Sequence, residues 1–269
     1  MRRVNRHMNG DIMSARIARM VANVGGEPLF NYTIHIDPDL RFIFFSNPIC
    51  ACSTLKATLN VATARALGIP FAINSAAMIH DRASNILKTP RQVGLNVLES
   101  LLDDPGVKKI AFIRSPESRF LSAFRKKLTY ESVFSKRVRT HLGVASDMPL
   151  RDFLTLDSFA KQVANDQTLR DLDEHWRLQR KQIFFDEVSD LDIGFVENFS
   201  ADTSRLLGEI FGADGYQIQD AVALNPSNAS GNRKRGGELS DAARGYIADA
   251  YAADYDMINL CRKRKAYSM

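Results

Sequence analysis

Two short apolar runs along the chain predict strands that are buried on both faces. Residues 41–45 and 108–113 are almost continuous in apolar side chains, a pattern typical of a parallel sheet. Residues 30–36 instead alternate apolar and polar positions, which predicts a strand with one face on the core. Shorter strands are predicted at residues 182–185 and 192–196.

Helical periodicity follows each of the two apolar runs. Apolar residues recur at helical spacing from Leu55 to Ala66, with Ser53 as the predicted N-cap, and a second helix is predicted over residues 117–128. Between the two units, residues 71–90 are typical of a loop and residues 93–102 of a helix. The order strand, loop, helix, given twice, predicts an α/β fold with a central parallel sheet.

The C-terminal half of the chain is richer in helical patterns, at residues 150–164, 201–211 and 240–253. The first 25 residues are basic and predict a peripheral segment with a weak amphipathic helix, ended by Gly25, Gly26 and Pro28. Because we find no internal repeat and no obvious linker, we expect a single domain over residues 1–269.

Composition narrows the class of protein. The 269 residues are 45% hydrophobic and 25% charged, ordinary values for a globular chain, and they exclude wholesale disorder. A net charge of +5 fits an anionic ligand without requiring nucleic acid. No apolar run approaches the ~20 residues that span a bilayer. Three cysteines are too few for a disulfide scaffold and indicate a reducing compartment.

Several common motifs are missing. The sequence has no GxxxxGK[ST] loop, no GxGxxG after a strand, no HExxH and no GxSxG. Cys50 and Cys52 are spaced C-x-C with no second pair nearby, so a zinc site is not expected and no metal is predicted.

The first stretch with candidate chemistry follows the strand at residues 41–45. A loop of small residues leads into a helix, and the amides of such a loop and of the first helical turn bind anions, assisted by the helix dipole. The alternative is an ordinary turn with a capped helix. The expected anion ligands are Cys50, Ala51, Cys52, Ser53, Thr54 and Lys56.

The second stretch follows the strand at residues 108–113. Arg114 leaves the carboxyl end of this strand, where ligands of open α/β sheets lie, and its guanidinium suits a phosphate. Ser122 lies two turns along the next helix and is expected to face the same place. Arg119 is predicted to make a structural salt bridge.

Together these stretches resemble the sulfotransferases, specifically the Golgi-type carbohydrate sulfotransferases and their bacterial relatives. The resemblance rests on five motifs in the family's order, spread over residues 40–258. They are PICACSTLK at 48–56, RSPESRFLSAFR at 114–125, EHWRLQ at 174–179, DIGFVEN at 192–198 and YAADY at 251–255.

The resemblance implies a P-loop-like three-layer sandwich and a donor, 3′-phosphoadenosine 5′-phosphosulfate (PAPS). It assigns the 5′-phosphosulfate to the 50–56 loop and the 3′-phosphate to Arg114 and Ser122. A late basic loop covers the 3′-phosphate in this family, which implicates Arg233, Lys234 and Arg235 here.

The resemblance also implies a hydroxylated acceptor, a saccharide or glycolipid, and a base that deprotonates it. Some relatives place a histidine base in the segment that contains His80, and we take His80 as the candidate. The family has a lysine after the loop proline, where this chain has Ile49; Lys56 is the candidate to replace it at the leaving oxygen.

Two alternatives stay open at this point. The first, suggested by Ile49, is a non-catalytic protein of the same fold that binds a nucleotide or glycan. The second is a P-loop kinase-like phosphotransferase. A bacterial-type cytoplasmic enzyme is the simplest expectation, although the basic residues 262–265 could contact an anionic lipid surface.

Overall fold

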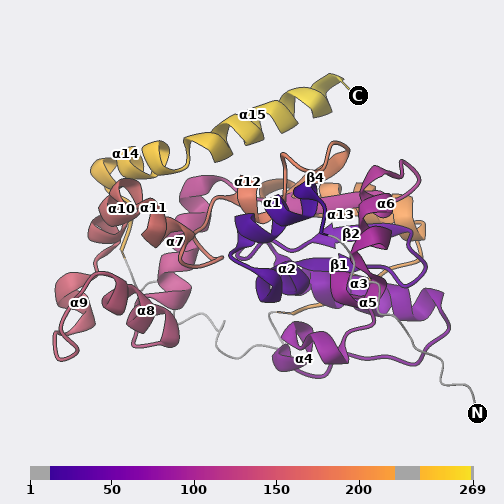
Figure 1. The fold of residues 1–269 in the computed structure, drawn as a ribbon, viewed down its shortest axis with the longest axis horizontal. Helices are drawn as coiled ribbons and strands as arrows, with labels where there is room; N and C mark the ends of the chain where they lie inside the picture. Colours follow the sequence, from indigo (N-terminus) through magenta and orange to yellow (C-terminus); the bar gives the residue numbers. More distant parts are fainter. Residues whose placement is uncertain (1–12, 222–236, 268–269) are drawn as a thin grey trace, which may run out of the picture.

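The computed structural model describes residues 13–221 and 237–267 (Figure 1). A part built around the sheet lies beside a purely helical part, and the last helix runs along both. Among the described residues, no helix combines the length and hydropathy needed to cross a membrane.

The sheet consists of four strands within the described ranges, in the order β1-β2-β3-β4. The strand β2 pairs in parallel with β3, which pairs in parallel with β4, while β1 is antiparallel to β2 at the edge. The strands are β1 (Ile34–Ile36), β2 (Phe42–Phe45), β3 (Lys108–Ile113) and β4 (Leu191–Phe195).

Helices surround the sheet and build the second part of the molecule. Those around the sheet are α1 (Ala15–Val24), α2 (Glu27–Thr33), α3 (Cys52–Ala66), α4 (Ala76–His80), α5 (Pro90–Val93), α6 (Leu95–Asp103), α12 (Gln179–Gln182) and α13 (Phe199–Phe211). The helical part contains α7 (Pro116–Lys127), α8 (Val133–His141), α9 (Leu150–Phe153), α10 (Leu156–Asn165), α11 (Gln167–Asp171) and α14 (Asp241–Ala250), and α15 (Ala252–Tyr267) joins the two parts. Two 3₁₀ turns are Arg82–Ser84 and Val196–Asn198.

The sheet is the middle of three layers, as predicted. Alternate residues of β2 belong to two different cores: Ile43 and Phe45 pack with α1, α2, α6 and α15, whereas Phe42 and Phe44 pack with α3 and α13. A third core fills the helical part, around Phe159 and Trp176. Both faces of the central strands are therefore apolar, which explains their continuous hydrophobic runs.

Two predicted strands and one predicted loop differ from the structure. Residues 30–33 belong to α2, because Pro28 suits a first helical turn and the buried Phe30 and Thr33 have helical spacing. Residues 182–185 end α12 in a turn rather than forming a strand, with Phe184 at a φ of 57°. The predicted loop at residues 71–90 contains α4.

Gly194 of β4 gives a test of this packing. A Cβ at this position would lie 2.5 Å from the ring of Phe112, its partner in the β3–β4 register, so the site has no space for a methyl group. We expect Gly194→Ala to lower the free energy of unfolding by about 1–3 kcal/mol, measured by urea denaturation. The matched control is Gly208→Ala in α13, where a Cβ meets nothing within 4 Å; it should be neutral or stabilising by up to about 1 kcal/mol. Equal effects at both positions would contradict the packing.

Candidate functional site

The loop between β2 and α3 has an unusual backbone. Ile49 and Ala51 have φ values of 69° and 56°, in the left-handed region that β-branched residues such as isoleucine rarely adopt. Helix α3 begins at Cys52 with Ala51 as its N-cap, so the prediction of Ser53 as N-cap is wrong. Among the described residues, no side chain caps this helix, which leaves the first-turn amides free for an anion.

Lys56 lies one turn into α3 and is 1% exposed. Its ammonium stands 4.1 Å from the centroid of the Tyr32 ring, and among the described residues it has no hydrogen bond or ion pair. Burial lowers the pKa of this ammonium. A buried cation without an anion is costly, so the fold maintains a positive charge below the loop at a cost in stability.

His80 ends α4 beside this loop. Its Nδ1 lies 3.0 Å from the hydroxyl of Tyr32 and its Nε2 lies 3.3 Å from Oγ of Ser53. Burial, together with the charges of Lys56 and Lys127, lowers the pKa of His80 to about 4. The imidazole is therefore uncharged at neutral pH and able to accept a proton.

The two side chains of the second candidate anion site also lie together. The guanidinium of Arg114 donates to Oγ of Ser122 at 2.9 Å, and among the described residues it has no carboxylate partner. Glu197 accepts the amide of Ser115 at 2.9 Å and fixes the turn that follows Arg114. The structure thus brings together the two residues that the sequence assigned to one phosphate.

A buried amide joins the two sites. Oε1 of Gln179 accepts from Nδ2 of Asn47, Sγ of Cys50 and the amide of Arg114, and Nε2 of Gln179 donates to the carbonyl of Arg114. In turn Asp254 of α15 accepts the amide of Gln179 at 2.9 Å. These contacts give a structural role to two of the motifs that carry the family resemblance.

Arg119 corrects a further prediction. It is 2% exposed and, among the described residues, makes no salt bridge. It donates instead to the carbonyls of Pro48, Glu174 and Arg177. Its role is structural, as expected, but it acts by tying the β2–α3 loop to the turn that follows α11.

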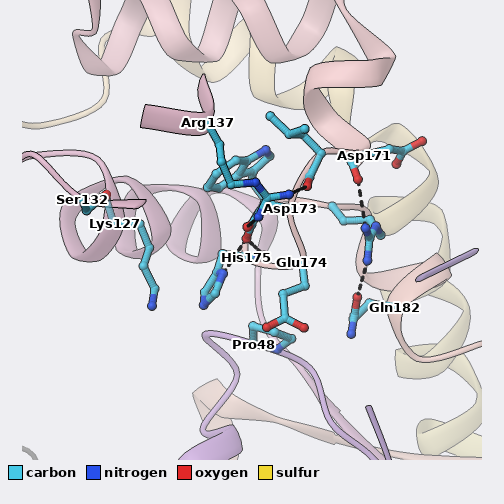
Figure 2. Close-up of polar contacts among 12 residues, drawn as sticks. Pro48, Lys127, Ser132, Arg137, Asp171, Asp173, Glu174, His175 and Gln182 are labelled. Carbon is cyan, nitrogen blue, oxygen red and sulfur yellow. Dashed lines mark hydrogen bonds and ion pairs between the residues drawn. The ribbon is translucent and has the colours of Figure 1, made fainter. Parts of the chain in front are cut away.

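Three polar side chains, from α7 and from the turn after α11, face the loop that contains Pro48. Figure 2 shows Lys127, Glu174 and His175 pointing the same way, toward the loop that contains Pro48. Lys127 and Glu174 lie 47 positions apart, so no local pattern indicates that they meet, although Glu174 begins one of the five motifs. Tyr32 was missed for the same reason.

Some of the remaining predicted ligand residues lie within the described part of the chain and others lie outside it. Cys50 is buried, and burial raises the pKa of its thiol to about 12; the thiol donates to Gln179 and its backbone amide donates to the carbonyl of Asn47, so both groups are structural. Cys52 and Thr54 are half-buried at the start of α3. Arg233, Lys234 and Arg235 lie outside the described residues. Within those residues, no group of three or more potential metal ligands occurs.

Comparison with known proteins identifies the family. A model of the sulfotransferase family matches residues 32–259, which include both anion sites, Tyr32, His80 and Asp254. Comparisons with curated proteins and with solved structures give no significant match. The match covers most of the chain and agrees with the α/β fold and with the two strand-end sites. The chain therefore belongs to the sulfotransferase family, whose members are PAPS-dependent transferases.

Proposed function

We propose that this enzyme transfers the sulfuryl group of PAPS to a hydroxyl of a saccharide or a related polyhydroxylated acceptor. The observation that carries the proposal is Lys56, a buried cation beneath an uncapped helix start, with no anionic partner among the described residues. A bound phosphosulfate would supply the missing counter-charge and accept the open amides.

The second anion site supports the same donor. Arg114 and Ser122 present a guanidinium and a hydroxyl to one place, which suits a phosphate monoester. The buried side-chain amide of Gln179 bonds to groups in both sites, so the fold fixes the distance between them. A ligand with two anionic groups, one at each end of a nucleoside, satisfies both at once.

The bound donor supplies an activated sulfuryl group with a good leaving phosphate. Transfer of such a group needs little covalent assistance from the protein, because charge spreads over the equatorial oxygens. We assign stabilisation of that charge to Lys56 and the amides of residues 51–54. Lys56 thereby takes the place of the lysine that Ile49 replaces.

We assign proton removal from the acceptor hydroxyl to His80. Tyr32 holds its Nδ1, and its Nε2 lies beside Ser53 at the edge of the donor loop. A bound phosphosulfate would offer the Ser53 hydroxyl an acceptor, and with that hydroxyl turned to it the Nε2 of His80 would be open to the acceptor. A cytoplasmic location and a role for the basic loop at residues 233–235 stay predictions.

Arg114 tests the 3′-phosphate assignment. Arg114→Ala should weaken binding of adenosine 3′,5′-bisphosphate by about 2–4 kcal/mol, because a charge-assisted bidentate contact is lost. Ser122→Ala should cost about 1 kcal/mol, as it removes one neutral donor. Isothermal titration calorimetry measures both. Adenosine 5′-phosphosulfate, which lacks the 3′-phosphate, serves as the control ligand and should bind all three proteins equally; wild-type protein with no preference between the ligands refutes the assignment.

Lys56 tests the phosphosulfate site. Lys56→Met removes an unpaired buried charge, so the free energy of unfolding should be unchanged or increased, while the affinity for adenosine 3′,5′-bisphosphate falls by about 2 kcal/mol or more. The matched control is Lys109→Met. Lys109 is equally buried but pairs with Asp190 at 2.8 Å, so its loss should destabilise the fold by about 1.5–3 kcal/mol without affecting the nucleotide. Unaltered nucleotide affinity in Lys56→Met contradicts the proposal.

His80 tests the assignment of the base. In the free protein, its ring should titrate near pH 4, well below the usual pKa of about 6.5, and should stay uncharged from pH 5 to 8. Nuclear magnetic resonance of the histidine rings measures this. His80→Gln should lower kcat by about 10²-fold or more with nucleotide affinity unchanged. A variant with wild-type kcat assigns the base elsewhere.

A further inference from the structure

The polar side chains beside Pro48 include groups that the protein itself does not use. Among the described residues, the ammonium of Lys127, the carboxylate of Glu174 and Nε2 of His175 have no hydrogen bond or ion pair. All three residues are half-buried, and their side chains point into one space (Figure 2). Polar groups that converge without partners in a partly desolvated place are a binding arrangement rather than a packing one.

The fold holds two of these groups rigidly. Oδ1 of Asp173 lies 2.6 Å from Nδ1 of His175, while Oδ2 of Asp173 accepts from Arg137 of α8 at 2.8 Å. The carboxylate of Asp173 thus fixes the orientation of the ring and leaves Nε2 facing the space beside Pro48. The ring of Phe134 packs edge-on against His175 and also lies under the ammonium of Lys127, 4.3 Å from its centroid.

The turn that carries Glu174 is fixed to the donor loop. Arg119 donates to the carbonyls of both Glu174 and Pro48, so the carboxylate cannot move independently of that loop. The three side chains face the loop that leads into α3 (Figure 2), and His80 lies beside the start of the same helix, with its Nε2 3.3 Å from Oγ of Ser53. The three groups and the proposed base therefore adjoin the same loop, where the acceptor hydroxyl has to meet the donor.

We propose that Lys127, Glu174 and His175 form the acceptor subsite of this enzyme and that they select a polyhydroxylated acceptor, a sugar, over a phenol. The inference rests on the proposed function and deepens it. A carboxylate, an imidazole nitrogen and an ammonium can each bond to a neighbouring sugar hydroxyl, with the Glu174 carboxylate able to accept from two of them. A phenol offers one hydroxyl and an apolar ring, and it would leave these groups desolvated and unpaired. Asp173 and Arg137 are positioning residues.

Acceptor kinetics test this assignment. Turnover of sulfur-labelled PAPS is measured with chitooligosaccharides, glucuronate-containing oligosaccharides and 4-nitrophenol, using wild-type protein, Lys127→Met, Glu174→Gln and His175→Gln. Each variant should raise KM for the best sugar by tenfold or more. The Kd for adenosine 3′,5′-bisphosphate should stay within twofold, which also shows that each variant is folded.

Two matched controls come from the same part of the molecule. His141→Gln removes the other histidine that pairs with an aspartate, Asp166 at 2.7 Å, and Lys126→Met removes the exposed neighbour of Lys127. Both should leave KM and Kd within twofold of wild type. Asp173→Asn should raise the acceptor KM less than His175→Gln does, and it should change the pH dependence of that KM. The charged or titratable groups around His175 are Asp173, Arg137, Lys127, Glu174 and His80.

The outcomes separate this inference from the proposed function. Wild-type protein that does not bind adenosine 3′,5′-bisphosphate refutes the proposed function, and the subsite with it. Wild-type protein that binds it while all three variants keep a normal sugar KM refutes the subsite alone. If the variants lose affinity for adenosine 3′,5′-bisphosphate as well as raising the sugar KM, these residues bind the donor and the subsite assignment is wrong. If the wild-type protein prefers 4-nitrophenol, or sulfates no sugar in the panel, the proposed selectivity is wrong.

Discussion

The geometry of the site depends on one buried side-chain amide. Gln179 is fully buried and bonds to groups at the ends of both β2 and β3, through Asn47 and Cys50 on one side and both backbone atoms of Arg114 on the other. Since a buried amide left unpaired costs about 1–3 kcal/mol, each of these bonds is strongly maintained. The two loops therefore cannot shift relative to each other without breaking a connected set of bonds.

Arg119 extends this constraint to the helical part. It carries its charge into the interior without a carboxylate among the described residues and uses three backbone carbonyls instead. Carbonyl dipoles solvate the guanidinium while leaving its positive charge uncancelled close to the loop. The same residue thus fixes the turn at residues 174–177 against the β2–α3 loop and adds to the positive potential there.

The donor loop holds features that lower stability. A β-branched residue in the left-handed region, an uncapped helix start and an unpaired lysine occur within eight positions, at Ile49, Ala51 and Lys56. Strained backbone and unsatisfied charge persist where the surrounding structure over-determines them, and they gather at ligand sites. Here the rigid neighbours are the buried strand β2 and Gln179, and the feature they maintain is a helix start with open first-turn amides above a buried lysine.

The α/β class, both central parallel strands, the candidate anion-binding loop after each of them and the family can all be read from the sequence. These features are local: an apolar run, a break and a helical stripe are readable within about 25 residues. The helix over residues 27–33 forms despite the alternation there, because Pro28 suits a first helical turn and Phe30 fits the core. Only packing brings Tyr32 to His80, and Lys127 to Glu174 and His175, since contacts between residues far apart in sequence leave no periodic signal in the chain.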